Sequence, residues 1–324
     1  MNRFEARRWA RSAAVAVVSR APLGLFAGAR RRYDERLRRD PASRPPLLLR
    51  LARLRPVPPA VDAFSPPGRP DVRFVSRTAG VTQWTYWLGM EEVARLGAGT
   101  RVWEALCAGA DEVVEIGANI GFYTVPGGRA ARGAYRAYEP HPESAAVLRA
   151  NLAENGLTAV DVQEAAVVAG PAREVELAVP PAFDGATPGN ATLAPEFSGG
   201  SVVPVQGVPV NDVLGAADLL KLDVEGLEAP LLEAAWDELV RLRPAIMIEV
   251  HDVNRPLRAL LPALLRATEA RAYAMRQASL VAVADEGLGT GALFDRYRTW
   301  DYLLVPDARR ALVTGVRIAE RVTR

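Results

Sequence analysis

Three charged residues stand in a stretch whose other residues are typical of a buried strand. The segment Leu219 to Gly226 reads LLKLDVEG, so Lys221, Asp223 and Glu225 alternate with apolar residues and share one face of the expected strand. Charges in a strand covered on both faces are costly unless they are paired or used in chemistry. An ion pair of Lys221 with Asp223 or Glu249 and a reactive site are both compatible with this pattern.

A histidine follows the next apolar strand. Glu249 and His251 alternate on one face of the segment Ala245 to His251. A histidine beside carboxylates is suited to act as a general base at neutral pH, so we predict His251 as the base. Asp223 or Glu225 would orient or replace it. The alternative, in which these side chains hold a divalent cation, lacks a recognisable ligand spacing, and we predict no metal site.

A glycine turn follows the apolar strand Val113 to Ile116. Gly117 and Gly121 lack a Cβ and tolerate positive φ, so the backbone of this turn can approach a ligand closely. Glu115 and Asn119 occupy the positions where the dinucleotide fingerprint G-x-G-x-x-G has its first and second glycines. Glu115 would repel a pyrophosphate and attract the sulfonium and ammonium groups of S-adenosylmethionine. The sign of this charge favours S-adenosylmethionine over NAD.

A second acidic residue, Glu139, ends the following strand and precedes Pro140. A carboxylate at the carboxyl end of the second strand can accept hydrogen bonds from both hydroxyls of a ribose. NAD and S-adenosylmethionine both contain a ribose, so this motif does not distinguish them. Glu139 could instead stabilise the helix behind it. Because Glu139 ends the strand that follows the glycine turn, as a ribose-binding carboxylate would, we favour the ribose role.

Strands and helices alternate around these motifs. This order predicts a parallel sheet with helices on both faces, and it places all the motifs at the carboxyl ends of the strands, where open α/β sheets bind ligands. The apolar periodicity predicts strands at 112–116, 135–139, 160–168, 174–179, 219–224 and 245–251, helices at 121–132, 142–155 and 228–240, and a Gly/Pro/Ala-rich loop at 180–200.

The composition is that of a folded protein with an uneven distribution of charge. The chain has 324 residues, 49% of them hydrophobic, a formal net charge of +2 and one cysteine, Cys107. A disulfide-stapled scaffold and a thiolate metal cluster are therefore excluded, and we expect a reducing, cytoplasmic location. Residues 1–55 contain fifteen arginines and four acidic residues and so carry +11, which leaves −9 on the rest of the chain. Lys221 is the only lysine.

The N-terminal segment is basic and then rich in proline. Its longest apolar stretch, Ser12 to Ser19, is far shorter than the roughly 20 residues that span a bilayer. Residues 1–40 predict a basic helix that lies on an anionic membrane, is solvated or docks on the core. Membrane contact is the less favoured of these. From Pro41 to Pro70 the prolines predict an extended connector.

Taken together, the four motifs resemble the FkbM family of S-adenosylmethionine-dependent methyltransferases. The pattern of that family is D/E-x-G-A-N-x-G, then F/Y-E-P-x-P, then K-x-D-x-E-G, then an E-V-H strand. This sequence has, in the same order, Glu115 to Gly121, Tyr138 to Pro142, Lys221 to Gly226 and Glu249 to His251. Four ordered motifs are far more specific than one glycine loop.

The resemblance implies a class I methyltransferase fold, which is an α/β Rossmann-like fold with a seven-stranded, mostly parallel sheet. It also implies methyl transfer to an oxygen of a small molecule, sugar or glycan. Asp223, Glu225 and His251 would line the reaction crevice. The donor would be bound by the turn, by the ribose carboxylate and by residues near the adenine, namely Glu115, Gly117, Ala118, Asn119, Gly121, Glu139, Pro140, Glu164 and Ala165. The chain would then divide into a basic, Pro-rich extension (1–71), a helical lead-in that packs on the core (72–110) and the methyltransferase domain (111–324).

Three other functions remain as alternatives. An NAD-linked oxidoreductase has the same architecture, but Glu115 and Asn119 replace two glycines of its fingerprint. A nucleic-acid methyltransferase would fit the basic N-terminus, but the net negative charge beyond residue 55 speaks against nucleic acid as a partner. A protein that binds the donor without catalysis is the third. The expected acceptor is therefore a small molecule or a carbohydrate.

Overall fold

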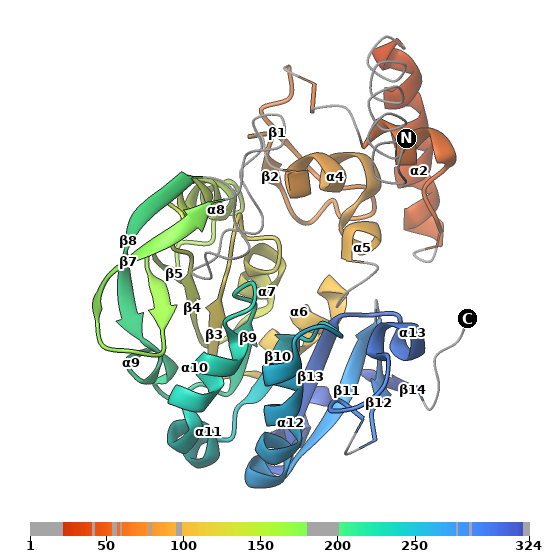
Figure 1. Ribbon diagram of the computed structural model, residues 1–324. Helices are drawn as coiled ribbons and strands as arrows, with labels where there is room; N and C mark the ends of the chain where they lie inside the picture. Colours follow the sequence, from red (N-terminus) through yellow and green to blue (C-terminus); the bar gives the residue numbers. More distant parts are fainter. Residues whose placement is uncertain are drawn as a thin grey trace, which may run out of the picture. The chain divides into compact units, whose positions relative to one another are not determined.

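The computed structural model describes residues 22–40, 43–53, 57–58, 60–77, 80–94, 99–179, 201–276, 278–284 and 287–319. The chain forms two compact units, an N-terminal unit that runs to Val93 and a C-terminal unit that begins at Ala94. Figure 1 shows their elements. The expected boundaries at residues 71 and 110 differ from this division and stay predictions. Residues 1–21 and the expected loop 180–200 lie outside the described residues.

The N-terminal unit is built on aromatic side chains. Phe26 and Trp87 meet edge to face with their ring centroids 6.1 Å apart, and both are buried. The Arg30 guanidinium donates hydrogen bonds to the carbonyl oxygens of Tyr86 at 2.7 Å and Ser65 at 2.6 Å. The elements of this unit are α2 (Leu23–Arg39), α3 (Leu47–Ala52), β1 (Ala63–Phe64), β2 (Phe74–Val75), α4 (Gly80–Leu88) and α5 (Met90–Val93).

The C-terminal unit contains a large sheet, so the expected α/β class is confirmed. The order of its strands is β14-β12-β11-β13-β10-β9-β3-β4-β5. The strands are β3 (Glu112–Ile116), β4 (Ala134–Tyr138), β5 (Val160–Gln163), β9 (Leu219–Leu222), β10 (Ala245–Glu249), β11 (Ala270–Arg276), β12 (Ser279–Ala282), β13 (Asp301–Pro306) and β14 (Arg317–Ala319).

Most of the sheet is parallel. The strands from β5 through β4, β3 and β9 to β10 pair in parallel, whereas β13 runs antiparallel to both β10 and β11. The described part of this sheet has nine strands instead of the expected seven. The short strands β12 and β14 add to its β11 edge, and segments of three or four residues leave little periodicity in the sequence.

One predicted strand is divided between two sheets. The expected strand 160–168 is β5 in the large sheet and then β6 (Ala166–Val168), which pairs with β8 (Ser201–Pro209) in a separate three-stranded sheet. The third strand there is β7 (Arg173–Val179), which lies close to the expected 174–179. The division arises because β6 finds its partner in a segment about 40 residues further along the chain, and local periodicity does not record such a pairing.

Helices cover both faces of the large sheet. Apolar side chains of β3, β9 and β10 pack in one cluster with leucines of α10, α11 and α12, which lie in front of the sheet in Figure 1. The helices of this unit are α6 (Thr100–Gly109), α7 (Thr124–Ala130), α8 (Pro142–Glu154), α9 (Val210–Leu214), α10 (Glu228–Ala234), α11 (Trp236–Leu242), α12 (Arg255–Thr268) and α13 (Leu293–Tyr297). No helix in the described part is long and apolar enough to cross a membrane.

The helix expected at 121–132 begins three residues later, at Thr124. It contains Gly127, a residue that weakens an isolated helix. A Cβ at this position would lie 2.5 Å from the indole nitrogen of Trp103 on α6. The glycine therefore allows α6 and α7 to pack closely, and this packing offsets the low helix propensity.

The glycine turn after β3 depends on a similar close approach. Gly117 has φ 86°, and a Cβ there would lie 1.8 Å from the carbonyl oxygen of Asp223. Gly156 has φ 68° with no atom within 4 Å of its Cβ position. An alanine at either position would have to adopt a left-handed backbone, which costs about 1–2 kcal/mol. Only an alanine at Gly117 would also push β3 and the segment after β9 apart.

We therefore expect Gly117→Ala to lower the free energy of unfolding by at least about 3 kcal/mol, and Gly156→Ala by about 1 kcal/mol. Urea denaturation of both variants beside the parent protein measures the difference. Equal losses in the two variants would show that the contact with Asp223 does not constrain this turn.

Candidate active site

The turn after β3 has a left-handed backbone at three positions and is tied to the end of β4. Gly117, Asn119 and Gly121 have φ values of 86°, 49° and 87°. The backbone N–H groups of Gly117 and Ala118 both donate to the carbonyl oxygen of Tyr138, at 3.0 Å. The structure thus holds the predicted donor-binding turn in a defined shape, with Ala118 buried inside it.

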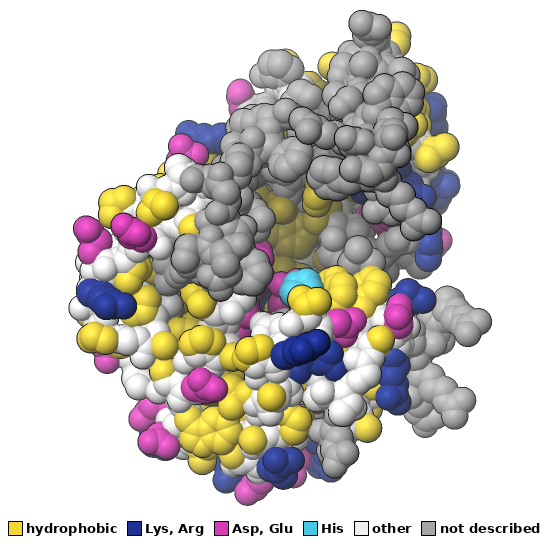
Figure 2. Space-filling view, in the orientation of Figure 1, with side chains coloured by type: hydrophobic (Ala, Val, Ile, Leu, Met, Phe, Trp, Pro, Cys, Tyr) yellow, Lys and Arg dark blue, Asp and Glu magenta, His cyan; other side chains and the backbone are white. Residues whose placement is uncertain are grey.

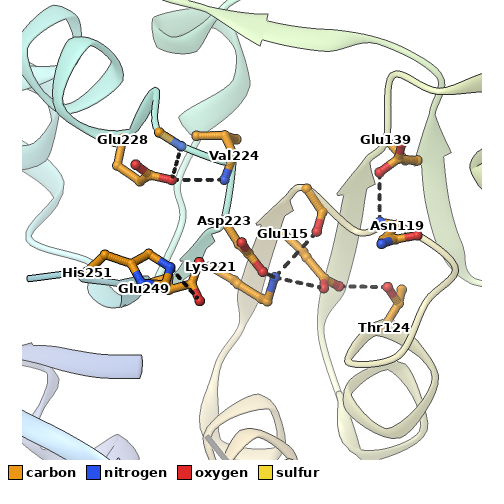
Figure 3. Close-up of polar contacts among 12 residues, drawn as sticks. Glu115, Asn119, Thr124, Glu139, Lys221, Asp223, Val224, Glu228, Glu249 and His251 are labelled. Atoms are coloured by element: carbon orange, nitrogen blue, oxygen red, sulfur yellow. Dashed lines mark hydrogen bonds and ion pairs between the residues drawn. The ribbon is translucent and has the colours of Figure 1, made fainter. Parts of the chain in front are cut away.

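Glu139 lies beside this turn, as its sequence position predicts. The Asn119 N–H donates to Glu139 Oε2 at 2.7 Å, and the His141 N–H donates to Oε1 at 2.9 Å (Figure 3). Burial raises the pKa of Glu139 to about 7, although both backbone hydrogen bonds act in the opposite direction. Each carboxylate oxygen keeps capacity for a further hydrogen bond. Pro140 follows, half-buried.

Glu115 is fully buried under the turn and is held by other side chains of the protein. Its Oε2 accepts hydrogen bonds from the hydroxyls of Tyr135 at 2.6 Å and Thr124 at 2.8 Å. Its Oε1 accepts no hydrogen bond and lies 3.8 Å from Lys221 Nζ. Burial raises the pKa of Glu115, and the Lys221 charge opposes this shift. The predicted contact of Glu115 with the donor stays a prediction, since these partners hold the carboxylate inside the fold.

Lys221 joins the donor side of the site to the crevice. Its Nζ lies 3.0 Å from Asp223 Oδ2 and 3.4 Å from the Gly117 carbonyl oxygen (Figure 3). It also lies 5.2 Å from the centre of the Tyr123 ring. Burial alone would lower the pKa of Lys221, but the charges of Asp223 and Glu115 outweigh it and raise the pKa. Of the two ion pairs predicted for this lysine, the one with Asp223 forms.

The predicted crevice residues come together after β9 and β10. His251 Nε2 lies 3.2 Å from Glu249 Oε1, and the hydrogen bond with Glu249 raises the pKa of the imidazole above its ordinary value. The His251 side chain is 43% exposed and Asp223 is 34% exposed, so both are accessible. Burial, together with the charges of Asp223 and Glu249, raises the pKa of Glu225 to about 8. Figure 2 shows a histidine beside acidic and hydrophobic side chains on this face.

Glu228 supports the crevice, and the sequence analysis did not single it out. It is buried in the first turn of α10, where its Oε1 accepts from the N–H groups of Val224 at 3.2 Å and Gly226 at 3.1 Å. Its Oε2 accepts from Asn254 Nδ2 at 3.2 Å. Glu225 has φ 52° in the turn that these bonds close. An acidic residue in the first turn of a helix, two residues after a glycine, was the available signal.

Aromatic side chains next to His251 are a second feature that the sequence did not predict. The His251 ring lies 4.6 Å from Trp300, and Trp300 stacks on Phe294 with their centroids 4.3 Å apart. The Val250 N–H donates to the Trp300 carbonyl oxygen at 2.7 Å, which fixes Trp300 next to β10. Trp300 precedes β13, far from His251 in the sequence, so only the antiparallel pairing of β13 with β10 reveals it.

The residues predicted near the adenine follow β5. Glu164 is exposed and forms an ion pair with Arg149 at 2.7 Å, and Ala165 is buried. Their role in donor binding stays a prediction. Within the described residues, no group of three or more His, Cys, Asp or Glu side chains has an arrangement that could hold a metal ion.

Comparison with known proteins identifies a family to which this part of the chain is similar. Residues 115–275 match the family model described as "Methyltransferase FkbM domain". This range contains the glycine turn, Glu139, Lys221, Asp223 and His251. No curated protein matches the chain.

Similar solved structures include a methyltransferase FkbM from Methylobacillus flagellatus KT, at 16% identity and a TM-score of 0.39 over 60% of this chain and 43% of that chain. The chain thus covers less than half of that protein. Cofactor-bound Rv0187 from MTB is 18% identical, with a TM-score of 0.35, over 67% of this chain and 86% of that chain. An O-methyltransferase from Bacillus cereus in complex with SAH is 13% identical, with a TM-score of 0.33, over 66% and 85%.

The family match spans all four motifs that the sequence analysis identified, from the turn at Glu115 to the E-V-H strand at His251. Residues 115–275 of this protein thus form a domain of the FkbM family of S-adenosylmethionine-dependent methyltransferases.

Proposed function

We propose that this protein transfers the methyl group of S-adenosylmethionine to a hydroxyl oxygen of a small molecule or carbohydrate. The observation that carries the proposal is the position of two groups at the same edge of the sheet. Glu139 and the left-handed turn lie at the ends of β3 and β4, and Asp223, Glu225 and His251 follow β9 and β10. Lys221 connects the two groups.

The donor side offers acceptors for a nucleoside. Each carboxylate oxygen of Glu139 accepts a hydrogen bond from one backbone N–H group. Each can accept one more, and this capacity matches the two hydroxyls of a ribose. When bound, S-adenosylmethionine supplies a methyl group on a sulfonium cation. The Asp223 carboxylate near this edge favours a cationic ligand over a pyrophosphate. NAD is therefore the less favoured ligand.

The acceptor side offers a base. In its neutral form, His251 Nε2 can take the proton that a hydroxyl loses as its oxygen attacks the methyl carbon. Glu249 holds the imidazole and stabilises the cation that forms. Placing the two reactants contributes about 7–11 kcal/mol in favourable cases, more than one proton acceptor supplies, so a variant without His251 would keep part of its activity. The single cysteine is in keeping with a cytoplasmic location.

Donor binding tests the role of Glu139. We expect the dissociation constant for S-adenosylhomocysteine to rise about tenfold or more in Glu139→Gln, because a ribose loses its charged acceptor. Ribose hydroxyls favour the ionised carboxylate, and the pKa of Glu139 is about 7 in the free protein. Affinity should therefore increase from pH 6 to pH 8 in the parent protein and stay level in the variant.

Calorimetric titration at several pH values makes this measurement, with NAD as the control ligand and Glu233→Gln, at an exposed glutamate of α10, as the control variant for charge removal. Absence of S-adenosylhomocysteine binding in the folded parent protein would reject the proposed cofactor. Equal pH dependence in the parent and in Glu139→Gln would reject only the role of this residue.

The protonation of His251 can be measured without an acceptor, because the chain has only two histidines. We expect the pKa of His251 to lie above 6.5, owing to the hydrogen bond with Glu249, and that of His141 to lie below it, owing to burial. Glu249→Gln should lower the pKa of His251 and leave that of His141 unchanged. Titration of both imidazoles by NMR checks this expectation.

The same substitution predicts a kinetic result. Because the neutral imidazole is the base, methyl transfer should decline as pH falls through the pKa of His251. Glu249→Gln should move this decline to lower pH, as measured with a panel of hydroxyl acceptors. An acid limb that stays in place while the NMR titration shifts would show that another group takes the proton.

A further inference from the structure

The outer faces of α2 and α3 in the N-terminal unit combine positive charge with exposed leucines; we refer to the exposed side chains of Leu23–Arg39 and Leu47–Ala52 as the α2–α3 surface. Acidic residues are fewer there, and Asp34 is already paired with Arg38. Glu35 remains exposed on α2. The exposed cations on these two helices are Arg31, Arg32, Arg36, Arg38, Arg39 and Arg50.

Four leucines on the same helices are exposed. Leu23 is 41% exposed, Leu25 51%, Leu47 70% and Leu51 38%. The described part of the chain has eight large exposed hydrophobic side chains, and half of them are on these two helices. Leu47 and Leu51 are four residues apart and therefore lie on one face of α3. Single exposed leucines are ordinary, but four on two neighbouring helices indicate a binding surface.

These leucines are not needed by the core of their own unit. The inward side of α2 is filled by Phe26 and Tyr33, and the inward side of α3 by Leu49 and Ala52, all of them buried. Arg30 also points inward, where it bonds to backbone carbonyls. The two helices thus already have their intramolecular partners, and their exposed leucines remain available to another surface.

We propose that the α2–α3 surface binds the surface of a membrane that contains anionic lipids. Arginines interact with negatively charged headgroups, while leucines enter the boundary between headgroups and acyl chains. A nucleic acid would also attract the arginines, but it provides no apolar environment for four leucines. Residues 1–21 contain five arginines and one glutamate, so their charge adds to the attraction. This binding is independent of the proposed methyl transfer.

Sedimentation with vesicles tests the proposal on the full chain. The vesicles consist of phosphatidylcholine with about one third phosphatidylglycerol, and pure phosphatidylcholine serves as the reference. We expect sedimentation with the anionic vesicles at about 0.1 M salt, little with the neutral ones, and a decrease at about 1 M salt, where charges are screened within roughly 3 Å.

Substitutions separate the contribution of the leucines from that of the charge. Leu47→Ser combined with Leu51→Ser should weaken vesicle binding about tenfold or more, because both side chains lose their apolar burial. Val253→Ser, at an 86% exposed valine in the C-terminal unit, is the matched control and should have no effect. Arg31→Gln combined with Arg32→Gln should weaken binding to anionic vesicles only. Circular dichroism spectra and urea denaturation curves that match those of the parent protein verify that each variant is folded.

Three results would overturn the proposal. The first is no preference for anionic over neutral vesicles. The second is vesicle binding that the leucine variant does not weaken, together with tighter binding to a single-stranded RNA, which would identify the surface as a nucleic-acid site. The third is concentration-dependent association of the chain in analytical ultracentrifugation that the leucine variant abolishes, without vesicle binding, since the leucines would then join copies of this chain.

Discussion

The buried contact of Lys221 with Glu115 and Asp223 is the interaction on which the site depends. A charge in the middle of a parallel sheet is expensive to desolvate, and it persists only because opposite charges and a carbonyl oxygen surround it. This arrangement places the donor turn and the crevice on opposite sides of one ammonium group. Lys221 is the only lysine among the 40 lysine and arginine residues of the sequence, and its compact ammonium group differs in shape and hydrogen bonding from a planar guanidinium.

The backbone around this lysine is as constrained as its charges. Gly117 lets the turn after β3 contact the carbonyl of Asp223, and Asn119 takes a left-handed conformation that directs its N–H to Glu139. A ligand at this edge would meet groups that are already oriented, so little ordering would be left for binding. The carboxyl groups at this edge are also affected by their surroundings. Burial and the negative charge of Asp223 raise the pKa of Glu139 to about 7 and that of Glu225 to about 8, so both groups titrate near neutral pH.

The two compact units differ in charge, and this difference separates their proposed roles. The C-terminal unit holds the family domain and most of the acidic residues, whose negative charge suits a cationic donor. The N-terminal unit has arginines and leucines on the outside of α2 and α3 and an aromatic core of its own. Opposite charges on two parts of one chain are consistent with two different partners, a small molecule for one and an anionic surface for the other.

The sequence by itself determined the α/β class, the order of the strands and helices that carry the motifs, and the family, because apolar periodicity and glycine turns are local properties of the chain. Only the tertiary structure decided which carboxylates are accessible. Glu115 looks like a ligand contact in sequence, yet Tyr135, Thr124 and Lys221 from three other elements enclose it. In the same way, Trp300 reaches His251 only through the pairing of β13 with β10. Such contacts form between segments far apart in the chain, and short-range patterns contain no information about them.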